Sequence, residues 1–271
     1  NVNLHLDFGT LLLGSTRLSD YDNAFPFKDG SMNQSSGLLF ARGQKNISIT
    51  GFGTIDGQGG SKTFQFGNDA DGGPKRPKII YFVECKGIVV TDVTLRNSAY
   101  WVQHYEKCED VTIRGLKVFS HCNYNNDGLD IDAKNATISD CYIDVEDDAI
   151  CFKSDHPEFC ENITVTNCVT ASNCNAIKFG TASHGGYRNI AVSNCVVRRA
   201  AEDNIRHWSK QLEHISADVT VISGVAIEMV DGGIIDGITV SNISMRDVQT
   251  PIFIRLGDRH RTYRKEGGGL K

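Results

Sequence analysis

Two short strand patterns recur through most of this chain, and their spacing limits what it can fold into. The first reads NISIT, GIVVT, DVTIR, NATIS, NITVT, NIAVS and GITVS, starting at residues 46, 87, 110, 135, 162, 189 and 237. The second reads WVQHY, GLDID, AICFK, AIKFG, NIRHW, AIEMV and PIFIR, starting at residues 101, 128, 149, 176, 204, 226 and 251. Most copies lie 21 to 28 residues apart. Several strands per repeat at such a period are typical of a parallel β-solenoid.

The composition agrees with this fold class. Short β-branched runs are separated by Gly, Asn and Asp, and neither a heptad nor a long amphipathic helix is present. A leucine-rich repeat would need LxxLxL and a helix, and an immunoglobulin-like sandwich would not give one strand register seven times. The sequence therefore predicts an all-β, single-stranded, right-handed parallel β-helix (solenoid) over residues 1–271. Because the chain begins within a strand pattern and ends in glycines, we expect a single catalytic domain excerpted without its terminal caps.

Alternation within the second pattern assigns its faces. We predict that one apolar residue from each copy stacks inside the helix: Leu129, Ile150, Ile177, Ile205, Ile227 and Ile252. The intervening positions must point outward. They include Asp130, Cys151, Lys178, Arg206, Glu228 and Phe253, then Asp132, Lys153, Gly180, Trp208, Val230 and Arg255. An outward face with charges of both signs is either a binding groove or a solvated salt-bridge lattice.

The stretch from Asn125 to Ser154 carries two acidic groups, one around Asp127 and one at 146–148. If repeats stack, Asp127 faces Asp147 and Asp148. Clustered carboxyl groups raise the pKa of at least one member and can supply both an acid and a base. A solvated turn or a calcium site is the alternative interpretation.

The nine cysteines do not form paired clusters. Cys141, Cys168 and Cys195 occupy equivalent places in successive repeats, which favours a ladder of buried thiols over disulfides. One disulfide within the group Cys151, Cys160 and Cys174 is left open.

The formal charge of −5 argues against nucleic acid as a partner, although a local cationic patch can still bind an acidic substrate. No segment is long or apolar enough to cross a membrane, so we expect no membrane partner. We expect a secreted or periplasmic monomer that uses no cofactor and no metal.

Several motifs together resemble the polygalacturonase-type glycoside hydrolases of family 28. They are GTIDGQG at 53–59, the stretch from Arg76 to Ile113, NNDG at 125–128 where the family has NTDG, and EDDAICFKS at 146–154 where the family has QDDCIAINS. The resemblance implies an inverting hydrolase of α-linked galacturonic acid in pectic polysaccharide. In this reading Asp147 is the general acid, and Asp127 and Asp148 hold the attacking water.

Two motifs depart from the family pattern. The family's Gly-His-Gly appears as Cys174, Asn175 and Ala176, and its Arg-Ile-Lys appears as Arg206, His207 and Trp208. We expect substrate contacts from a set that spans both departures: Asp130, Lys153, Asn175, Lys178, His184, Arg206 and Trp208. Lys178 and Arg206 suit a uronate carboxylate, or else only compensate the acids.

Three other functions are also compatible with the sequence. The chain could be a rhamnogalacturonan-directed hydrolase of the same family. It could instead be a calcium-dependent solenoid lyase, in which the acids bind the ion. A non-catalytic carbohydrate-binding solenoid is the third.

Overall fold

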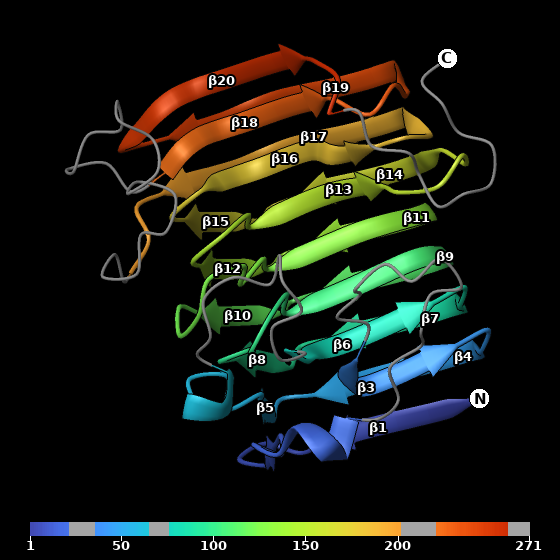
Figure 1. The fold of residues 1–271 in the computed structure, drawn as a ribbon, viewed down its shortest axis with the longest axis vertical. Helices are drawn as coiled ribbons and strands as arrows, with labels where there is room; N and C mark the ends of the chain where they lie inside the picture. The colour runs from blue at the N-terminus through green and yellow to red at the C-terminus, as the bar shows by residue number, and fades with distance from the viewer. Residues whose placement is uncertain (22–35, 65–75, 202–220, 260–271) are drawn as a thin grey trace.

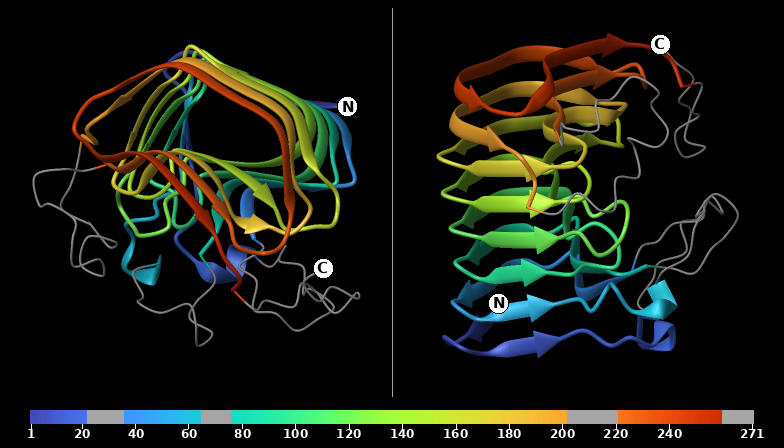
Figure 2. Two further views of the ribbon diagram at one scale, coloured as in Figure 1. Left: turned by 90° about the horizontal axis from the view of Figure 1, so that it is seen from above. Right: turned by 90° about the vertical axis from the view of Figure 1, so that its left-hand side faces the viewer.

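The computed structural model describes residues 1–21, 36–64, 76–201 and 221–259. Within them, 20 strands pair in parallel into one continuous sheet. The sheet winds into a stack of coils whose nearly closed cross-section is seen end-on in Figure 2. Figure 1 shows the same coils from the side, with strands from successive repeats lying one above another. This confirms the predicted all-β parallel β-helix.

The strands form three columns along the helix axis. The first column contains β1 (Val2–Leu6), β4 (Lys45–Gly51), β7 (Lys86–Thr91) and β14 (Cys160–Thr166). The second contains β2 (Leu11–Leu13), β5 (Thr54–Asp56), β8 (Thr94–Arg96), β10 (Lys117–Ser120), β12 (Tyr142–Val145) and β15 (Val169–Ser172). The third contains β3 (Gly37–Arg42), β6 (Lys78–Val83), β13 (Ile150–Ser154), β16 (Asn175–Ser183), β18 (Val221–Met229) and β20 (Val248–Leu256).

Four long strands bend and take part in two columns each. β9 (Gln103–Arg114) and β11 (Leu129–Ser139) pass from the third column into the first. β17 (Gly186–Arg198) and β19 (Ile234–Met245) pass from the first into the second. Two short 3₁₀ helices, Leu18–Tyr21 and Lys62–Phe64, lie between strands. Among the described residues, neither these nor any other helix is long and apolar enough to cross a membrane.

A left-handed backbone conformation begins every copy of the first repeat pattern. The φ angle is positive at all seven starting residues: Asn46, Gly87, Asp110, Asn135, Asn162, Asn189 and Gly237. Only Gly, Asn and Asp adopt this conformation at low cost, which explains why these three residue types begin the pattern. Side-chain amides then link neighbouring coils, because Asn162 donates to Asn135 (3.1 Å) and Asn189 donates to Asn162 (2.9 Å).

The inner line of the third column is apolar, as predicted, but its later members differ from those predicted. Leu129, Ile150 and Ile177 are fully buried and in register. The next member is Val225, whereas the prediction placed Ile205 and then Ile227 there. Ile205 lies outside the described residues, and β16 pairs directly with β18.

Ile227 belongs to a different inner line, level with Phe179 and Ile254. Phe179 stacks on Phe152 with ring centroids 4.4 Å apart. Ile252 lies on its predicted line but is 64% exposed, because β20 pairs on one side only within the described residues.

All nine cysteines lie in described residues, and all are free. The expected thiol ladder is present: the Sγ atoms of Cys141, Cys168 and Cys195 each lie 3.2 to 3.3 Å from the carbonyl two residues earlier. The disulfide left open within Cys151, Cys160 and Cys174 does not form.

Candidate active site

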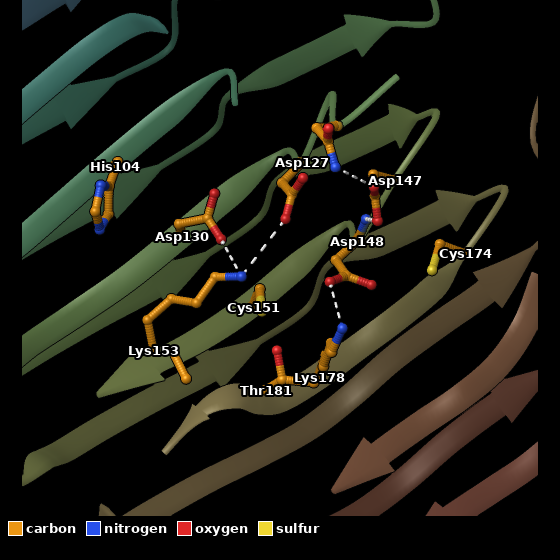
Figure 3. Close-up of polar contacts among 12 residues, drawn as sticks. His104, Asp127, Asp130, Asp147, Asp148, Cys151, Lys153, Cys174, Lys178 and Thr181 are labelled. Atoms are coloured by element: carbon orange, nitrogen blue, oxygen red, sulfur yellow. Dashed lines mark hydrogen bonds and ion pairs between the residues drawn. The ribbon is translucent and has the colours of Figure 1, made fainter. Parts of the chain in front are cut away.

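Three stacked turns that lead into the third column carry the predicted acidic residues. Asp127 lies in the turn before β11, Asp147 and Asp148 lie in the turn before β13, and Asn175 begins β16. The turns keep the spacing of the sheet, since the amide of Gly128 donates to the carbonyl of Asp148 at 2.8 Å. Side chains about 20 residues apart in sequence therefore meet on one outer face (Figure 3).

Asp148 is held as a charged carboxylate. Its Oδ2 receives the Lys178 ammonium at 2.9 Å, and its Oδ1 receives the Asn175 amide at 2.7 Å. Burial by itself would raise the pKa of this carboxyl, but the ammonium groups of Lys178 and Lys153 outweigh burial and hold the pKa below its ordinary value. Asn175, which replaces the histidine of the family motif, thus serves as a donor to a carboxylate.

The pKa of Asp127 is shifted in the opposite direction to that of Asp148. Asp127 is 3% exposed, and burial, followed by the negative charge of Asp147, raises its pKa well above the ordinary value. Lys153 counteracts this only in part, from 3.6 Å. A raised pKa within the acidic cluster was predicted, although the prediction named charge repulsion as the cause and the structure makes desolvation the larger one.

Asp147 has both carboxyl oxygens in contact with donors. Oδ1 accepts the backbone N–H of Asp148 at 2.9 Å, and Oδ2 accepts the side-chain amide of Asn125 at 3.3 Å. A proton carried by Asp147 must therefore use a lone pair that neither donor occupies. The orientation of this carboxyl is set by its neighbours before any ligand arrives.

The three aspartates open into a groove of about 880 Å³ along the outer face. This volume lies within the usual range for ligand pockets. On one side the groove is bounded by Tyr100, Trp101 and Asn125. On the other side it is bounded by residues of the last coils: Thr181, Ile222, Ser223, Glu228, Gln249, Thr250, Phe253, Arg255 and Arg259. An aromatic end and a charged end therefore flank the carboxylates.

Beside the aromatic end lies a buried layer of charged and aromatic groups. The Lys78 ammonium donates to His104 Nδ1 at 3.0 Å and lies 4.8 Å from the centre of the Trp101 ring. Burial lowers the pKa of Lys78 to about 8 and that of His104 well below its ordinary value. Lys153 approaches the same Trp101 ring at 4.6 Å, so two ammonium groups contact this indole.

Asp147, Asp148 and Cys174 each offer one atom within 4.8 Å of the other two, which is metal-ligand spacing. The Lys178 ammonium lies 2.9 Å from Asp148, and burial raises the pKa of the Cys174 thiol well above its ordinary value. A cation here would meet an ammonium group and a protonated thiol. These residues therefore fit a metal ion poorly.

Not every predicted substrate contact reaches the groove. Lys153, Asn175 and Lys178 line it. Asp130 is fully buried, 3.2 Å from Lys153, and burial raises its pKa to about 6. It supports Lys153 from beneath and is not a lining residue.

His184 lies away from the groove lining. It follows the end of β16 remote from Asn175, where its amide donates to Ser154 O at 2.7 Å, and it does not line the groove among the described residues. Arg206 and Trp208 lie outside the described residues.

Several lining residues were not predicted as site residues, and two of them, Asn125 and Arg255, bear on the chemistry. Asn125 is part of the NNDG motif, and the turn that places Asp127 in the groove also places Asn125 there. Arg255 was assigned an outward position by alternation alone. The structure pairs Arg255 with Glu228, whereas the prediction placed Val230 beside it. Ala226 lies beside Lys178, where the prediction placed Arg206.

Comparison with known proteins gives the family. The sequence profile of glycosyl hydrolases family 28 matches residues 23–259. A probable polygalacturonase from Vitis vinifera is 31% identical over 168 residues, which cover 58% of this chain and 33% of that protein. A polygalacturonase from Saccharomyces cerevisiae is 29% identical over 157 residues, 55% of this chain and 41% of that protein. The chain thus aligns with about a third to two fifths of the length of these relatives.

Solved structures agree on the fold. The polygalacturonase from Erwinia carotovora ssp. carotovora superposes with a TM-score of 0.72 at 21% identity, covering 94% of this chain and 68% of that one. The family 28 exopolygalacturonase from Yersinia enterocolitica gives 0.70 at 19% identity, covering 93% and 51%. The chain belongs to glycosyl hydrolases family 28.

Proposed function

We propose that this protein is a polygalacturonase-type glycoside hydrolase that cleaves α-linked galacturonic acid in pectic polysaccharide with inversion. The observation that carries the proposal is the contrast between buried carboxyl groups in one groove: Asp148 is held ionised by Lys178 and Asn175, whereas the pKa of Asp127 is raised. Cleavage with inversion needs an ionised carboxylate that accepts the proton of the attacking water, and Asp148 is such a group. The polygalacturonase names of the relatives add support.

In this proposal Asp147 donates its proton to the leaving glycosidic oxygen. Its two hydrogen-bond donors fix the carboxyl, so the proton is presented in one direction. Asp127 and Asp148 hold the attacking water. Asp148, which is held ionised, accepts the water's proton, and Asp127, beside it in the groove, holds the same water by a hydrogen bond.

The charged end of the groove favours an acidic sugar. Arg259 is bound to Asp231 and Thr181, and Lys178 is bound to Asp148. Arg255 is exposed and, among the described residues, has no hydrogen bond or ion pair. A guanidinium fork of this kind suits a uronate carboxylate. In this proposal Arg255 binds the uronate carboxylate, the role that the sequence analysis gave to Arg206.

The lyase alternative is less well supported. A calcium-dependent mechanism needs acids that are available to the ion, but Lys153 lies 3.6 Å from Asp127 and Lys178 lies 2.9 Å from Asp148. Ammonium groups already compensate the charge that would attract calcium.

The test is product analysis on defined oligogalacturonides and rhamnogalacturonan oligomers. We expect new reducing ends from oligogalacturonide, no ultraviolet-absorbing unsaturated product, and a first-formed anomer of inverted configuration in proton NMR. Unsaturated product that disappears with chelator would establish a lyase. Cleavage of the rhamnogalacturonan oligomer alone would make the protein a rhamnogalacturonan hydrolase. Binding of an oligomer without any product would make it a carbohydrate-binding solenoid.

A further inference from the structure

Arg76 is a fully buried arginine that does not line the groove. It lies just before β6, and its guanidinium is held between two aromatic rings, 4.7 Å from the centre of Tyr100 and 4.1 Å from the centre of Tyr124. The guanidinium also donates to the carbonyls of Ala99 (3.2 Å) and Tyr124 (2.6 Å). Ring stacking and these two hydrogen bonds fix the plane of the side chain.

One further hydrogen bond links this group to the site. A terminal nitrogen of Arg76 donates to Asn125 Oδ1 at 3.1 Å. A guanidinium has only donors, so the amide of Asn125 must turn its oxygen toward Arg76. The NH₂ group of that amide then faces Asp147, where it donates to Oδ2 at 3.3 Å. An amide turned the other way would place donors against donors on one side and acceptors against acceptors on the other.

We propose that Arg76 is a positioning residue that acts through Asn125 to orient the carboxyl of Asp147 for proton transfer. The inference rests on the proposed function, in which Asp147 protonates the leaving oxygen. Asp148 N–H fixes one oxygen of this carboxyl and the oriented amide fixes the other. Without Arg76, the Asn125 amide loses the partner that decides which of its ends faces Asp147, and the acid then samples unproductive orientations.

The test compares leaving groups. Arg76→Lys keeps the positive charge but loses the planar fork, and Arg96→Lys is the control because Arg96 pairs with Asp56 away from the groove. We expect Arg76→Lys to lower kcat on oligogalacturonide about 10- to 100-fold with little change in KM, and to lower turnover of an activated aryl or fluoride galacturonide less than about threefold. Arg96→Lys should match wild type on both. Equal losses on the two substrates, or no loss, would overturn the proposal.

A second variant covers the case in which Arg76→Lys does not fold. Asn125→Ala leaves Arg76 in place and removes the link, so it should reproduce the same dependence on the leaving group. If it slows both substrates alike, the link is not used for proton donation.

A third measurement separates this proposal from the proposed function. The side-chain amide signals of Asn125, assigned by their absence in Asn125→Ala, should be slow to exchange in wild type and fast in Arg76→Lys, while those of Asn162 stay unchanged. If wild type cleaves no galacturonide, the proposed function fails, and this measurement still tests the link. Unchanged exchange of the Asn125 amide in Arg76→Lys would refute the proposed link from Arg76 through Asn125 to Asp147.

Discussion

The outer faces of the first and third columns follow the same alternation but differ in what surrounds them. In the first column Thr112, Thr137 and Thr164 are in register and exposed. In the third column His104 and Asp130 are in register and point outward in the same sense, yet they are 4% and 0% exposed. An outward position in a solenoid is therefore not equivalent to a solvated one.

The difference arises from what covers each face. Over the third column, the Trp101 ring contacts the ammonium groups of Lys78 and Lys153. The turns that carry the aspartates border the same face (Figure 3). Charges under this cover lose water, so the pKa of Lys78 falls and that of Asp130 rises. The exposed threonines of the first column offer no such chemistry. Clustered, desolvated charge is what marks the third column as the functional face.

The largest expected effect contrasts the two faces directly. Asp147→Asn should lower cleavage of oligogalacturonide about 10²- to 10⁴-fold by removing the proton donor, while leaving measurable turnover of an activated aryl or fluoride galacturonide. Asp127→Asn and Asp148→Asn should abolish both, because any substrate attacked by water needs these groups. Thr164→Ser, on the first column, should be silent. Near wild-type cleavage of oligogalacturonide by Asp147→Asn would assign the proton to another group.

The next effect concerns the charged end of the groove. Arg255→Ala should lower kcat/KM on oligogalacturonide about 10- to 100-fold, as expected for a charge-assisted contact, and should affect methyl-esterified substrate far less. Arg246→Ala is a matched control, because Arg246 is exposed and does not line the groove. Equal losses on both substrates would give Arg255 a structural role.

A smaller effect tests the turns that define the first column. Asn162 has φ near 59° and bonds to amides of the coils on both sides. Asn162→Ala should destabilise the fold by about 1–2 kcal/mol, because an L-residue with a Cβ disfavours this conformation. Asn162→Gly, which accepts the conformation, should cost less. Urea unfolding measures both, and equal losses would mean that the amide ladder and not the backbone carries the stability.

The smallest effect depends on pH. The pKa of Asp130 rises from 3.8 to about 6 on folding, so the folded state binds the extra proton and is stabilised below pH 3.8. That stability is lost as pH rises through about 6. Asp130→Asn removes this dependence. The Tm of the variant minus that of wild type should therefore be larger at pH 7 than at pH 4, by on the order of 2–4 °C. Scanning calorimetry at the two pH values decides it. An unchanged difference would mean that Lys153 fully compensates the Asp130 carboxylate.

The sequence predicted the parts of the fold that local rules control. Alternation and period identified the inner line from Leu129 to Ile177, and the turn residues at the start of the first pattern match the left-handed backbone found there. The prediction failed in the order of the later copies. NIRHW at 204 resembles a further repeat, but β16 pairs directly with β18 and the register moves to Val225. Similarity of short strands does not reveal which copies are neighbours, because pairing is decided by coil geometry.

For the site, sequence by itself determined which carboxyl groups could meet, because a regular repeat brings Asp127 beside Asp147 and Asp148 whatever the details of the loops. Only the tertiary structure decided their protonation and their partners. The raised pKa of Asp127, the lysine held against Asp148 and the path from Arg76 through Asn125 to Asp147 all depend on burial and on contacts between coils. Periodicity gives positions along the chain, whereas desolvation and hydrogen-bond direction exist only once segments distant in sequence are packed together.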